Sequence, residues 1–331
     1  MMSAEEIAEL ARQLSGGRTG GVRLADGRVT LALDATGMAS AERDALAARL
    51  SAELGALPGI SEVRVALTAV KRGRMLIAVG SGKGGVGKST VSANLAIALH
   101  AAGWRVGLVD ADIHGPSQPR LLDREEARPE ARGDKLVPVM SAYGVPLLSM
   151  GQLAKPGQAI AWRGPMAGRA LEQLIDADWG DAELLILDLP PGTGDIQLSM
   201  LQKFKPAGAI IVSTPQDLAL IDAARAITLF HDTDVPIIGM IENMAGYTCP
   251  HCGEVSDPFG QGGAEAAARS MGLPFLGRIP LTHAIRLASD AGVPPATRAD
   301  GDGAAFHALA AQVATWIADQ RAQPEIAHAA R

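Results

Sequence analysis

A glycine-rich segment between residues 80 and 90 carries the residue types that bind phosphate groups. It reads Gly-Ser-Gly-Lys-Gly-Gly-Val-Gly-Lys-Ser-Thr, so that Gly87, Lys88 and Ser89 follow Gly82 after four intervening residues. Glycines let backbone N–H groups turn inward around phosphate oxygens, while the lysine reaches the terminal phosphates and the serine binds Mg²⁺. We expect a nucleoside triphosphate to be bound by the whole segment, namely Gly82, Lys83, Gly84, Gly85, Val86, Gly87, Lys88, Ser89 and Thr90.

Lys83 is a second lysine in this segment, five positions before Lys88. Its own chain already supplies Lys88 to the terminal phosphates, so Lys83 would add new charge if it reached the nucleotide of a partner subunit. A solvated surface lysine is the alternative.

Acidic side chains follow two apolar runs farther along the chain. Asp110 and Asp112 end the first run two positions apart, which places both carboxylates on the same side. Either can orient water or a metal ion, although Asp112 could instead cap the following turn. Asp188 ends the second run and is expected to hold Mg²⁺ through a water molecule.

Two further positions at strand ends are candidates. Residues 189–195 combine rigid prolines with permissive glycines, which suits a switch loop whose Gly192 amide reports the γ-phosphate. A plain β-turn is the alternative. Asn243 also follows a predicted strand, where a lone asparagine usually serves as a cap.

The chain has two cysteines, Cys249 and Cys252, separated by Pro250 and His251. A tetrahedral zinc ion or a cubane iron-sulfur cluster needs four protein ligands, so one chain cannot complete such a site. A two-fold dimer can, because it brings the same segment in twice. Zinc on the same four sulfurs and thiol redox catalysis remain alternatives, and His251 is expected to be a loop residue.

The elements that position these residues alternate from residue 75 onward. Continuous apolar runs separated by helical patterns predict buried strands in a mostly parallel sheet flanked by helices, with the ligand site at the carboxyl ends of the strands. The predicted strands cover residues 75–79, 105–110, 184–188, 209–214, 237–242 and 275–279, and a helical pattern over 91–99 follows the glycine-rich segment. This strand, loop and helix order argues against a mere glycine-rich turn.

We predict three regions: a small α+β accessory domain over residues 1–70, a nucleotide-binding α/β domain over 75–320, and a frayed tail over 321–331. The small domain should contain helices near 4–13 and 41–54, a turn over 16–21, and strands over 28–34 and 60–67. The last helix, about 304–320, carries an apolar stripe without a basic opposite face, which favours core packing over membrane binding.

The 331 residues are 47% hydrophobic, which is enough for a large core and excludes disorder as the main state. A net charge of −6 makes nucleic acid an unlikely partner. The acidic start does not resemble a signal peptide, and no apolar run is long enough to span a membrane, so we expect a cytoplasmic protein without a membrane partner.

These motifs together resemble the Mrp/ApbC family of iron-sulfur cluster carrier ATPases, in its bacterial form. The resemblance rests on segments 82–90, 110–117, 162–166, 188–195, 213–217, 242–244 and 249–253. It implies a homodimeric P-loop NTPase of the deviant Walker A type. The expected cofactors are ATP, Mg²⁺ and a [4Fe-4S] cluster, and the expected partners are cluster donors and apo iron-sulfur proteins.

The resemblance also implies individual roles. In the deviant P-loop ATPases the early lysine contacts the partner's nucleotide, which assigns Lys83 to catalysis in trans beside Lys88. The same likeness assigns Asp112 to activation of the attacking water and Asn243 to the adenine edge, and it implies slow turnover. A switch of the MinD and ParA type, with zinc on Cys249 and Cys252 stapling the dimer, is the competing interpretation.

Overall fold

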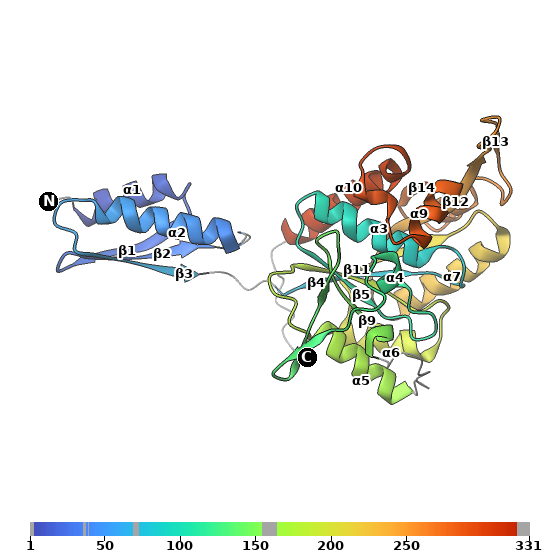
Figure 1. The fold of residues 1–331 in the computed structure, drawn as a ribbon, viewed down its shortest axis with the longest axis horizontal. Helices are drawn as coiled ribbons and strands as arrows, with labels where there is room; N and C mark the ends of the chain where they lie inside the picture. The colour runs from blue at the N-terminus through green and yellow to red at the C-terminus, as the bar shows by residue number, and fades with distance from the viewer. Residues whose placement is uncertain (1–2, 36–37, 39, 69–72, 154–163, 323–331) are drawn as a thin grey trace. The chain divides into compact units, whose positions relative to one another are not determined.

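The computed structural model describes residues 3–35, 38, 40–68, 73–153 and 164–322. The chain divides into two compact units, Met1–Gly73 and Arg74–Arg331, both drawn in Figure 1. Part of the family motif at 162–166 lies outside the described residues, as does the end of the chain from residue 323.

The smaller unit is a three-stranded sheet with two helices on one face (Figure 1). Its elements are α1 (Ala4–Leu14), β1 (Thr19–Ala25), β2 (Arg28–Asp34), α2 (Ser40–Gly55) and β3 (Glu62–Thr68). Alternate residues of β2, namely Val29, Leu31 and Leu33, are buried, as the period of two in a half-buried strand requires. They form one core with α1 and α2.

Strand β1 begins inside the segment for which the sequence predicted a turn. It pairs antiparallel with β2, and its register shifts between Gly20 and Arg23. Gly21 has a φ of 61°, which a bulge accommodates and a regular strand does not. The sequence did not predict this strand because Gly20 and Gly21 disfavour regular strand structure.

The larger unit is built on one mixed sheet with the strand order β13-β12-β11-β4-β10-β5-β9-β8, and β14 pairs with β12. The strands are β4 (Met75–Gly80), β5 (Val106–Asp110), β8 (Val139–Met140), β9 (Pro146–Ser149), β10 (Leu184–Asp188), β11 (Gly208–Ser213), β12 (Ile237–Thr248), β13 (Val255–Ser256) and β14 (Phe275–Leu281). All pairings are parallel except those of β8 and β13 at the edges. The predicted mostly parallel sheet is confirmed. A separate hairpin joins β6 (Glu130–Arg132) and β7 (Lys135–Val137).

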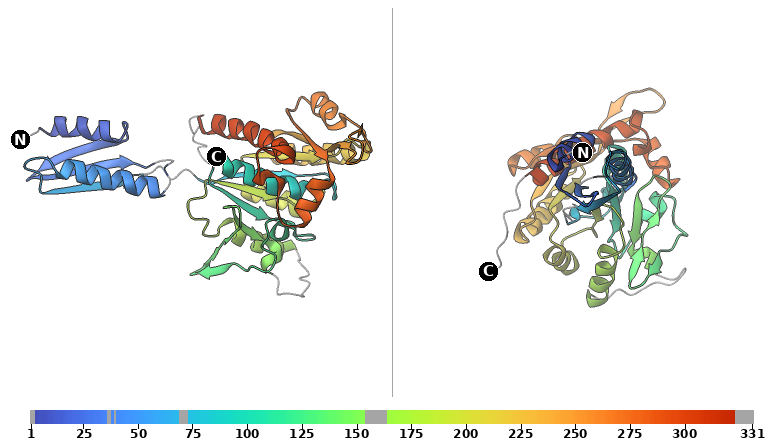
Figure 2. Two further views of the ribbon diagram at one scale, coloured as in Figure 1. Left: turned by 45° about the horizontal axis from the view of Figure 1, so that its top comes forward. Right: turned by 90° about the vertical axis from the view of Figure 1, so that its left-hand side faces the viewer.

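Helices cover both faces of this sheet. They are α3 (Lys88–Ala101), α4 (Gln118–Leu121), α5 (Gly164–Ile175), α6 (Asp195–Phe204), α7 (Asp217–Asp232), α8 (Gly263–Ser270), α9 (His283–Asp290) and α10 (Ala304–Ala322), with 3₁₀ turns η1 (Met150–Leu153), η2 (Pro295–Thr297) and η3 (Gly301–Gly303). One apolar core lies under α3 and α10, and a second under α5, α6, α7 and α8. Both views of Figure 2 show α10, in red, and α5, in yellow-green, on opposite sides of the sheet.

Helix α10 packs as its apolar stripe predicted, since Phe306, Leu309, Val313 and Ile317 are buried. Residues 321 and 322, which the sequence assigned to a frayed tail, continue this helix. The reason is that the Arg321 guanidinium donates to the Glu183 carboxylate at 2.7 Å. Among the described residues, we find no helix with the length and hydropathy needed to span a membrane.

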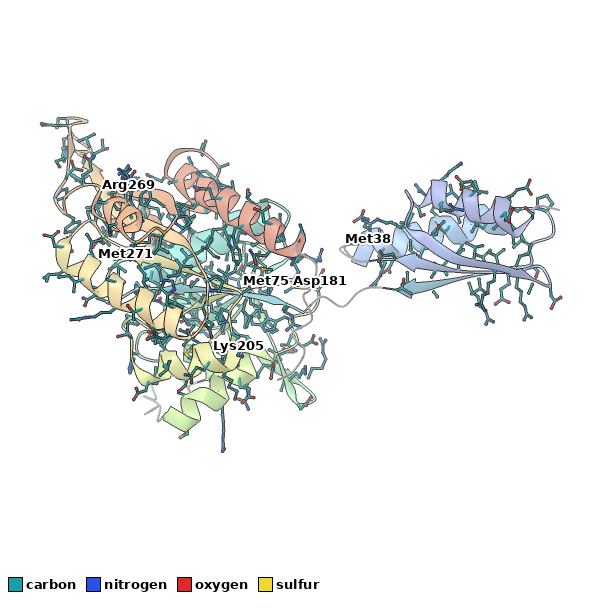
Figure 3. The ribbon with its side chains drawn as sticks, turned by 180° about the vertical axis from the view of Figure 1, so that it is seen from behind. Met38, Met75, Asp181, Lys205, Arg269 and Met271 are labelled. Atoms are coloured by element: carbon teal, nitrogen blue, oxygen red, sulfur yellow. The ribbon has the colours of Figure 1, made fainter. Side chains whose placement is uncertain are left out.

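The two ends of the parallel strands form opposite edges of the sheet and carry different residues. Met75 and Asp181, labelled in Figure 3, mark the edge where β4 and β10 begin. Asp110 and Asp188 are paired neighbours at the opposite edge, where β5 and β10 end. The parallel order of the strands therefore brings the two predicted acidic motifs together.

Candidate functional site

The glycine-rich segment forms a loop between β4 and α3. Gly85 and Gly87 have left-handed φ angles of 79° and 82°, and Gly87 is the N-cap of α3. A Cβ at Gly82 would lie 2.0 Å from the backbone of Asp222 in α7. Glycine is therefore required at these positions by the backbone itself, and the loop ends at a helix N-terminus, where anions bind.

A cavity of about 250 Å³ lies in front of this loop. Its lining comes from the loop, from the segment after β5 and from the segment after β10, namely Ser81, Lys83, Gly84, Gly85, Gly87, Lys88, Ser89, Thr90, Asp112, Gly115 and Pro191. A smaller hollow of about 140 Å³ between α5 and α6 is lined mainly by apolar side chains and lacks a phosphate-binding loop. We therefore place the candidate site in the first cavity.

Lys88 and Asp188 form a buried ion pair at the base of the site. Lys88 Nζ lies 2.7 Å from Asp188 Oδ1, and both side chains are almost fully buried. Ser92 Oγ donates to the same oxygen at 2.8 Å, while Gln118 Nε2 donates to Asp188 Oδ2 at 2.8 Å. The fully buried carboxylate is thus satisfied by three donors, as a buried charge requires.

Asp110 is also fully buried, beside Asp188 on the neighbouring strand. Burial, together with the nearby Asp188 carboxylate, raises the pKa of Asp110 to about 7. Ser149 Oγ and the Gln118 backbone N–H donate to Asp110 Oδ2 at 2.9 Å and 3.0 Å. Two fully buried carboxylates thus lie side by side in the site.

Asp112 lines the cavity, but its carboxylate also caps a turn. Asp112 Oδ1 accepts hydrogen bonds from the backbone N–H groups of His114 and Gly115, at 3.0 Å and 3.1 Å. This arrangement is the capping role that the sequence left open. Its position on the cavity wall also keeps the water-activating role available as a prediction.

Lys83 and Gly192 occupy different parts of the loop region. Lys83 lines the cavity and forms no ion pair with any described residue. The Gly192 amide donates to the Ser81 carbonyl at 3.0 Å, so this bond must open before Gly192 can contact a phosphate. Both functional assignments remain predictions.

Asn243 lies behind the loop rather than in the cavity lining. Its Nδ2 donates to the Val86 carbonyl at 2.8 Å. A Cβ at Gly87 would lie 2.1 Å from the same nitrogen, so the glycine makes room for this contact. Asn243 therefore supports the loop backbone, and its proposed contact with adenine remains a prediction.

Strand β12 continues beyond Asn243 to the cysteines. Glu242, fully buried, accepts from the backbone N–H groups of Gly262 and Ala264 and pairs with Arg278 at 3.0 Å. The strand is irregular after Asn243, where β14 pairing shifts register. It then forms with β13 a hairpin that projects from the larger unit (Figure 1).

Cys249 and Cys252 lie in the turn of this hairpin, with Cys249 partly buried and Cys252 exposed. The Cys249 N–H donates to Glu254 O and the Gly253 N–H donates to Cys249 O, both at 2.9 Å. Hydrogen bonds from the backbone N–H of Cys252 and of His251, and from the Cys252 side chain, lower the pKa of the Cys249 thiol. The lowered pKa raises the fraction of the thiolate, the form that binds metals, relative to an unperturbed cysteine.

The structure describes no group of three or more histidine, cysteine or carboxylate side chains that could hold a metal ion. The cysteine pair accordingly stands as two ligands. It lies apart from the nucleotide cavity, whose lining it does not enter. The described residues thus form two separate candidate sites.

Three residues that donate hydrogen bonds to Asp110 or Asp188 were not predicted from the sequence: Ser92, Gln118 and Ser149. Ser92 lies one helical turn after Lys88, a spacing that could have indicated it. Ser149 ends β9, a strand too short to stand out. Gln118 had no sequence signal.

A phosphate-binding loop, a lysine at a helix start and acidic residues at the ends of adjacent parallel strands define the class of P-loop NTPases. The family model described as "ParA: NUBPL iron-transfer P-loop NTPase" matches residues 72–315. The chain belongs to this family.

Individual proteins support this membership. An iron-sulfur cluster carrier protein of Deinococcus radiodurans is 44% identical over 274 residues, covering 80% of this chain and 77% of that protein. An Arabidopsis thaliana mitochondrial iron-sulfur protein required for NADH dehydrogenase is 45% identical, covering 76% and 81%. The structure of an Archaeoglobus fulgidus nucleotide-binding protein in complex with ADP is similar with a TM-score of 0.61 and 39% identity, covering 69% and 90%. The family resemblance found in the sequence is confirmed.

Proposed function

We propose that this protein is a homodimeric, slow ATPase that carries a [4Fe-4S] cluster on Cys249 and Cys252 of two chains and transfers it to apo-proteins. The observation that carries the proposal is the pair of cysteines on a projecting hairpin, where Cys249 is partly buried and has a lowered pKa, Cys252 is exposed, and the described residues supply no third ligand. Two ligands per chain match a four-ligand site on a two-fold axis. The relatives named as iron-sulfur cluster carriers support this choice of cargo. We place the protein in the cytoplasm, where reducing conditions keep both thiols available.

The nucleotide site fits ATP and Mg²⁺. Its loop backbone and Lys88 would hold the phosphates, while Ser89 would bind the metal directly and Asp188 would hold it through water. The oxygen atoms of these side chains suit a hard divalent cation, which neutralises phosphate charge when bound. Lys88 must exchange Asp188 for phosphate, a rearrangement that ties nucleotide binding to the acidic strand ends.

Apolar side chains beside the loop support the dimer. Leu218 and Ile221 lie in the first turns of α7, and they are 71% and 53% exposed. The same helix meets the loop where Asp222 packs against Gly82. A second copy docked on this face would cover these side chains and bring its Lys83 toward the nucleotide, where Asp112 would orient the attacking water.

Anaerobic reconstitution with iron and sulfide tests the cargo. We expect a brown protein with about two iron atoms per chain, as one [4Fe-4S] cluster per dimer requires. The Cys249→Ala/Cys252→Ala variant should retain no cluster and should bind ADP within twofold of the wild type. His251→Ala, which changes the residue between the cysteines, is the matched control and should keep the cluster.

Three results would contradict the proposal. A colourless protein that binds zinc after the same treatment would favour the MinD and ParA type of switch. A cluster retained by the double variant would place the ligands elsewhere. A loaded protein that fails to activate an apo [4Fe-4S] enzyme, under conditions in which free iron and sulfide succeed, would refute the transfer step.

A further inference from the structure

We infer that Gln118 is a further residue of the magnesium site. It positions Asp188, and its amide oxygen accepts a hydrogen bond from a water molecule of the bound divalent cation. The inference rests on the proposed binding of Mg²⁺ and nucleotide, and it concerns a residue that no sequence motif indicated.

Gln118 contacts three parts of the site at once. Its side chain is fully buried, and Nε2 donates to Asp188 Oδ2 at 2.8 Å and to the Ser89 carbonyl at 2.9 Å. Its backbone N–H donates to Asp110 Oδ2 at 3.0 Å. One residue thereby links the carboxylates that end β5 and β10 to the first turn of α3.

The two side-chain contacts fix the orientation of the Gln118 amide. Asp188 Oδ2 and the Ser89 carbonyl are both acceptors, so only the NH₂ group can face them. The oxygen Oε1 is then buried, and it accepts a hydrogen bond from no described residue. A buried acceptor without a donor is unfavourable, which points to a donor that the described residues do not supply.

The contacts of the Gln118 NH₂ group indicate the nature of that donor. Oε1 belongs to the same amide group, whose Nε2 contacts Asp188 and the backbone of Ser89, the two residues proposed to hold Mg²⁺. Water bound to a divalent cation donates strongly to neutral acceptors, and residues that orient such water tune metal affinity. A hydrated divalent cation therefore supplies the missing donor.

The contact with Asp188 gives Gln118 a second task. Lys88 and Ser92 donate to Asp188 Oδ1, whereas Gln118 donates to Oδ2. When Lys88 turns to the phosphates, Gln118 and Ser92 still hold the carboxylate. Because the amide is neutral, it does this without repelling the cation.

Gln118→Met tests both tasks, because methionine has a similar length and volume but neither a donor nor an acceptor of comparable strength. We would measure Mn²⁺ binding to the ADP complex by electron paramagnetic resonance, and ADP binding without metal by calorimetry. We expect Mn²⁺ affinity to fall about tenfold or more, and metal-free ADP affinity to change by less than about threefold. Gln152→Met is the matched control, since this buried glutamine bonds to Ser149 N and Ala127 O instead, and its Mn²⁺ affinity should equal that of the wild type.

Unchanged Mn²⁺ affinity in Gln118→Met, or an equal loss in Gln152→Met, would overturn the inference. If Gln118→Met does not fold, a crystal structure of the wild type with Mg²⁺ and ADP decides. We expect a metal-bound water within hydrogen-bond distance of Oε1, and contacts of this oxygen with protein atoms alone would refute the assignment. A wild type that binds neither ADP nor Mn²⁺ would refute the nucleotide site itself, whereas metal-dependent ADP binding that survives in Gln118→Met refutes only the role of Gln118.

Discussion

The nucleotide site and the cysteine hairpin differ in burial and in completeness. At the nucleotide site, Lys88, Asp110 and Asp188 are buried, Lys88 donates to Asp188, and Gln118 donates to both carboxylates, all within one chain. At the hairpin, Cys249 is half-buried and Cys252 is exposed, and the pair offers two of the four ligands that a cluster needs. The first site is largely built by the chain alone, whereas under the proposed function the second is half of a site that a partner chain completes.

This difference separates folding from function. Changes in the buried network should affect stability as well as nucleotide binding, because they leave charges or hydrogen-bonding groups unpaired. Changes at the exposed hairpin should affect metal binding with little cost to the fold. Lys83 belongs with the hairpin in this respect, since it forms no ion pair with any residue that the structure describes.

The largest expected effect concerns turnover. Lys83→Ala should lower the ATPase kcat about 1000-fold, as loss of a charge supplied in trans does in related chemistry, and Asp112→Asn about 100-fold. ADP affinity should change by less than about threefold in both, measured by calorimetry. Equal losses of binding and turnover would show that these residues hold the nucleotide and do not act on the reaction.

Mixing two inactive variants tests the trans role of Lys83 directly. In a mixed dimer of Lys83→Ala and Lys88→Ala chains, one of the two sites regains both lysines if Lys83 acts across the interface. Equal mixing should restore up to about a quarter of wild-type activity, because half of the dimers are mixed and half of their sites are intact. No recovery despite proven subunit exchange would place Lys83 in the site of its own chain.

The next largest effect concerns Lys88. Lys88→Ala should weaken ADP binding about 100-fold and lower the free energy of unfolding by about 3 kcal/mol, because Asp188 remains buried without its cation. Cluster content after reconstitution should not change. Lys203→Ala, which removes a surface ion pair with Glu172, is the control and should cost less than about 1 kcal/mol.

A smaller effect concerns pH. The pKa of Asp110 is raised to about 7, chiefly by burial, so between about pH 4 and 7 the folded protein retains a proton that the unfolded chain releases. Stability from this group therefore falls as the pH rises through that window. In urea unfolding, the free energy of unfolding of Asp110→Asn minus that of the wild type should increase by about 2 to 4 kcal/mol between pH 4 and pH 7.

The smallest effect concerns the thiols. Because backbone N–H groups lower the pKa of Cys249, it should react with iodoacetamide about threefold faster than Cys252 at pH 7. The rate of Cys249 can be measured in Cys252→Ser, and the rate of Cys252 in Cys249→Ser. Equal rates would remove the electrostatic distinction between the two sulfurs.

The sequence predicted the parts of the fold that depend on local patterns. Lys88 and Asp188 were assigned to one site because a glycine-rich loop and the end of an apolar strand meet at the same edge of a parallel sheet. Strands such as β2 and β10 were found with the correct bounds, since each is a regular run of apolar or alternating residues.

The missed features depend on contacts between distant segments. Gln118 reaches Asp188 across 70 positions, and nothing in its neighbourhood in the chain marks that contact. Strand β9 is four residues long, too short for a recognisable sequence pattern, and it is defined as a strand by its pairing with β5. Asn243 donates its amide N–H to the Val86 carbonyl, a contact that the sequence did not predict and that leaves its assignment to the nucleotide base a prediction.

Strand β12 contacts the loop through Asn243 and ends at the residue before Cys249. If nucleotide binding at one end of this strand is coupled to cluster binding at the other, the coupling must be reciprocal. If a change of nucleotide alters cluster affinity by some factor, loading the cluster must alter nucleotide affinity by the same factor. In a carrier built this way, the affinity for nucleotide would differ between the cluster-loaded and the empty protein, so the bound nucleotide would reflect whether a cluster is present.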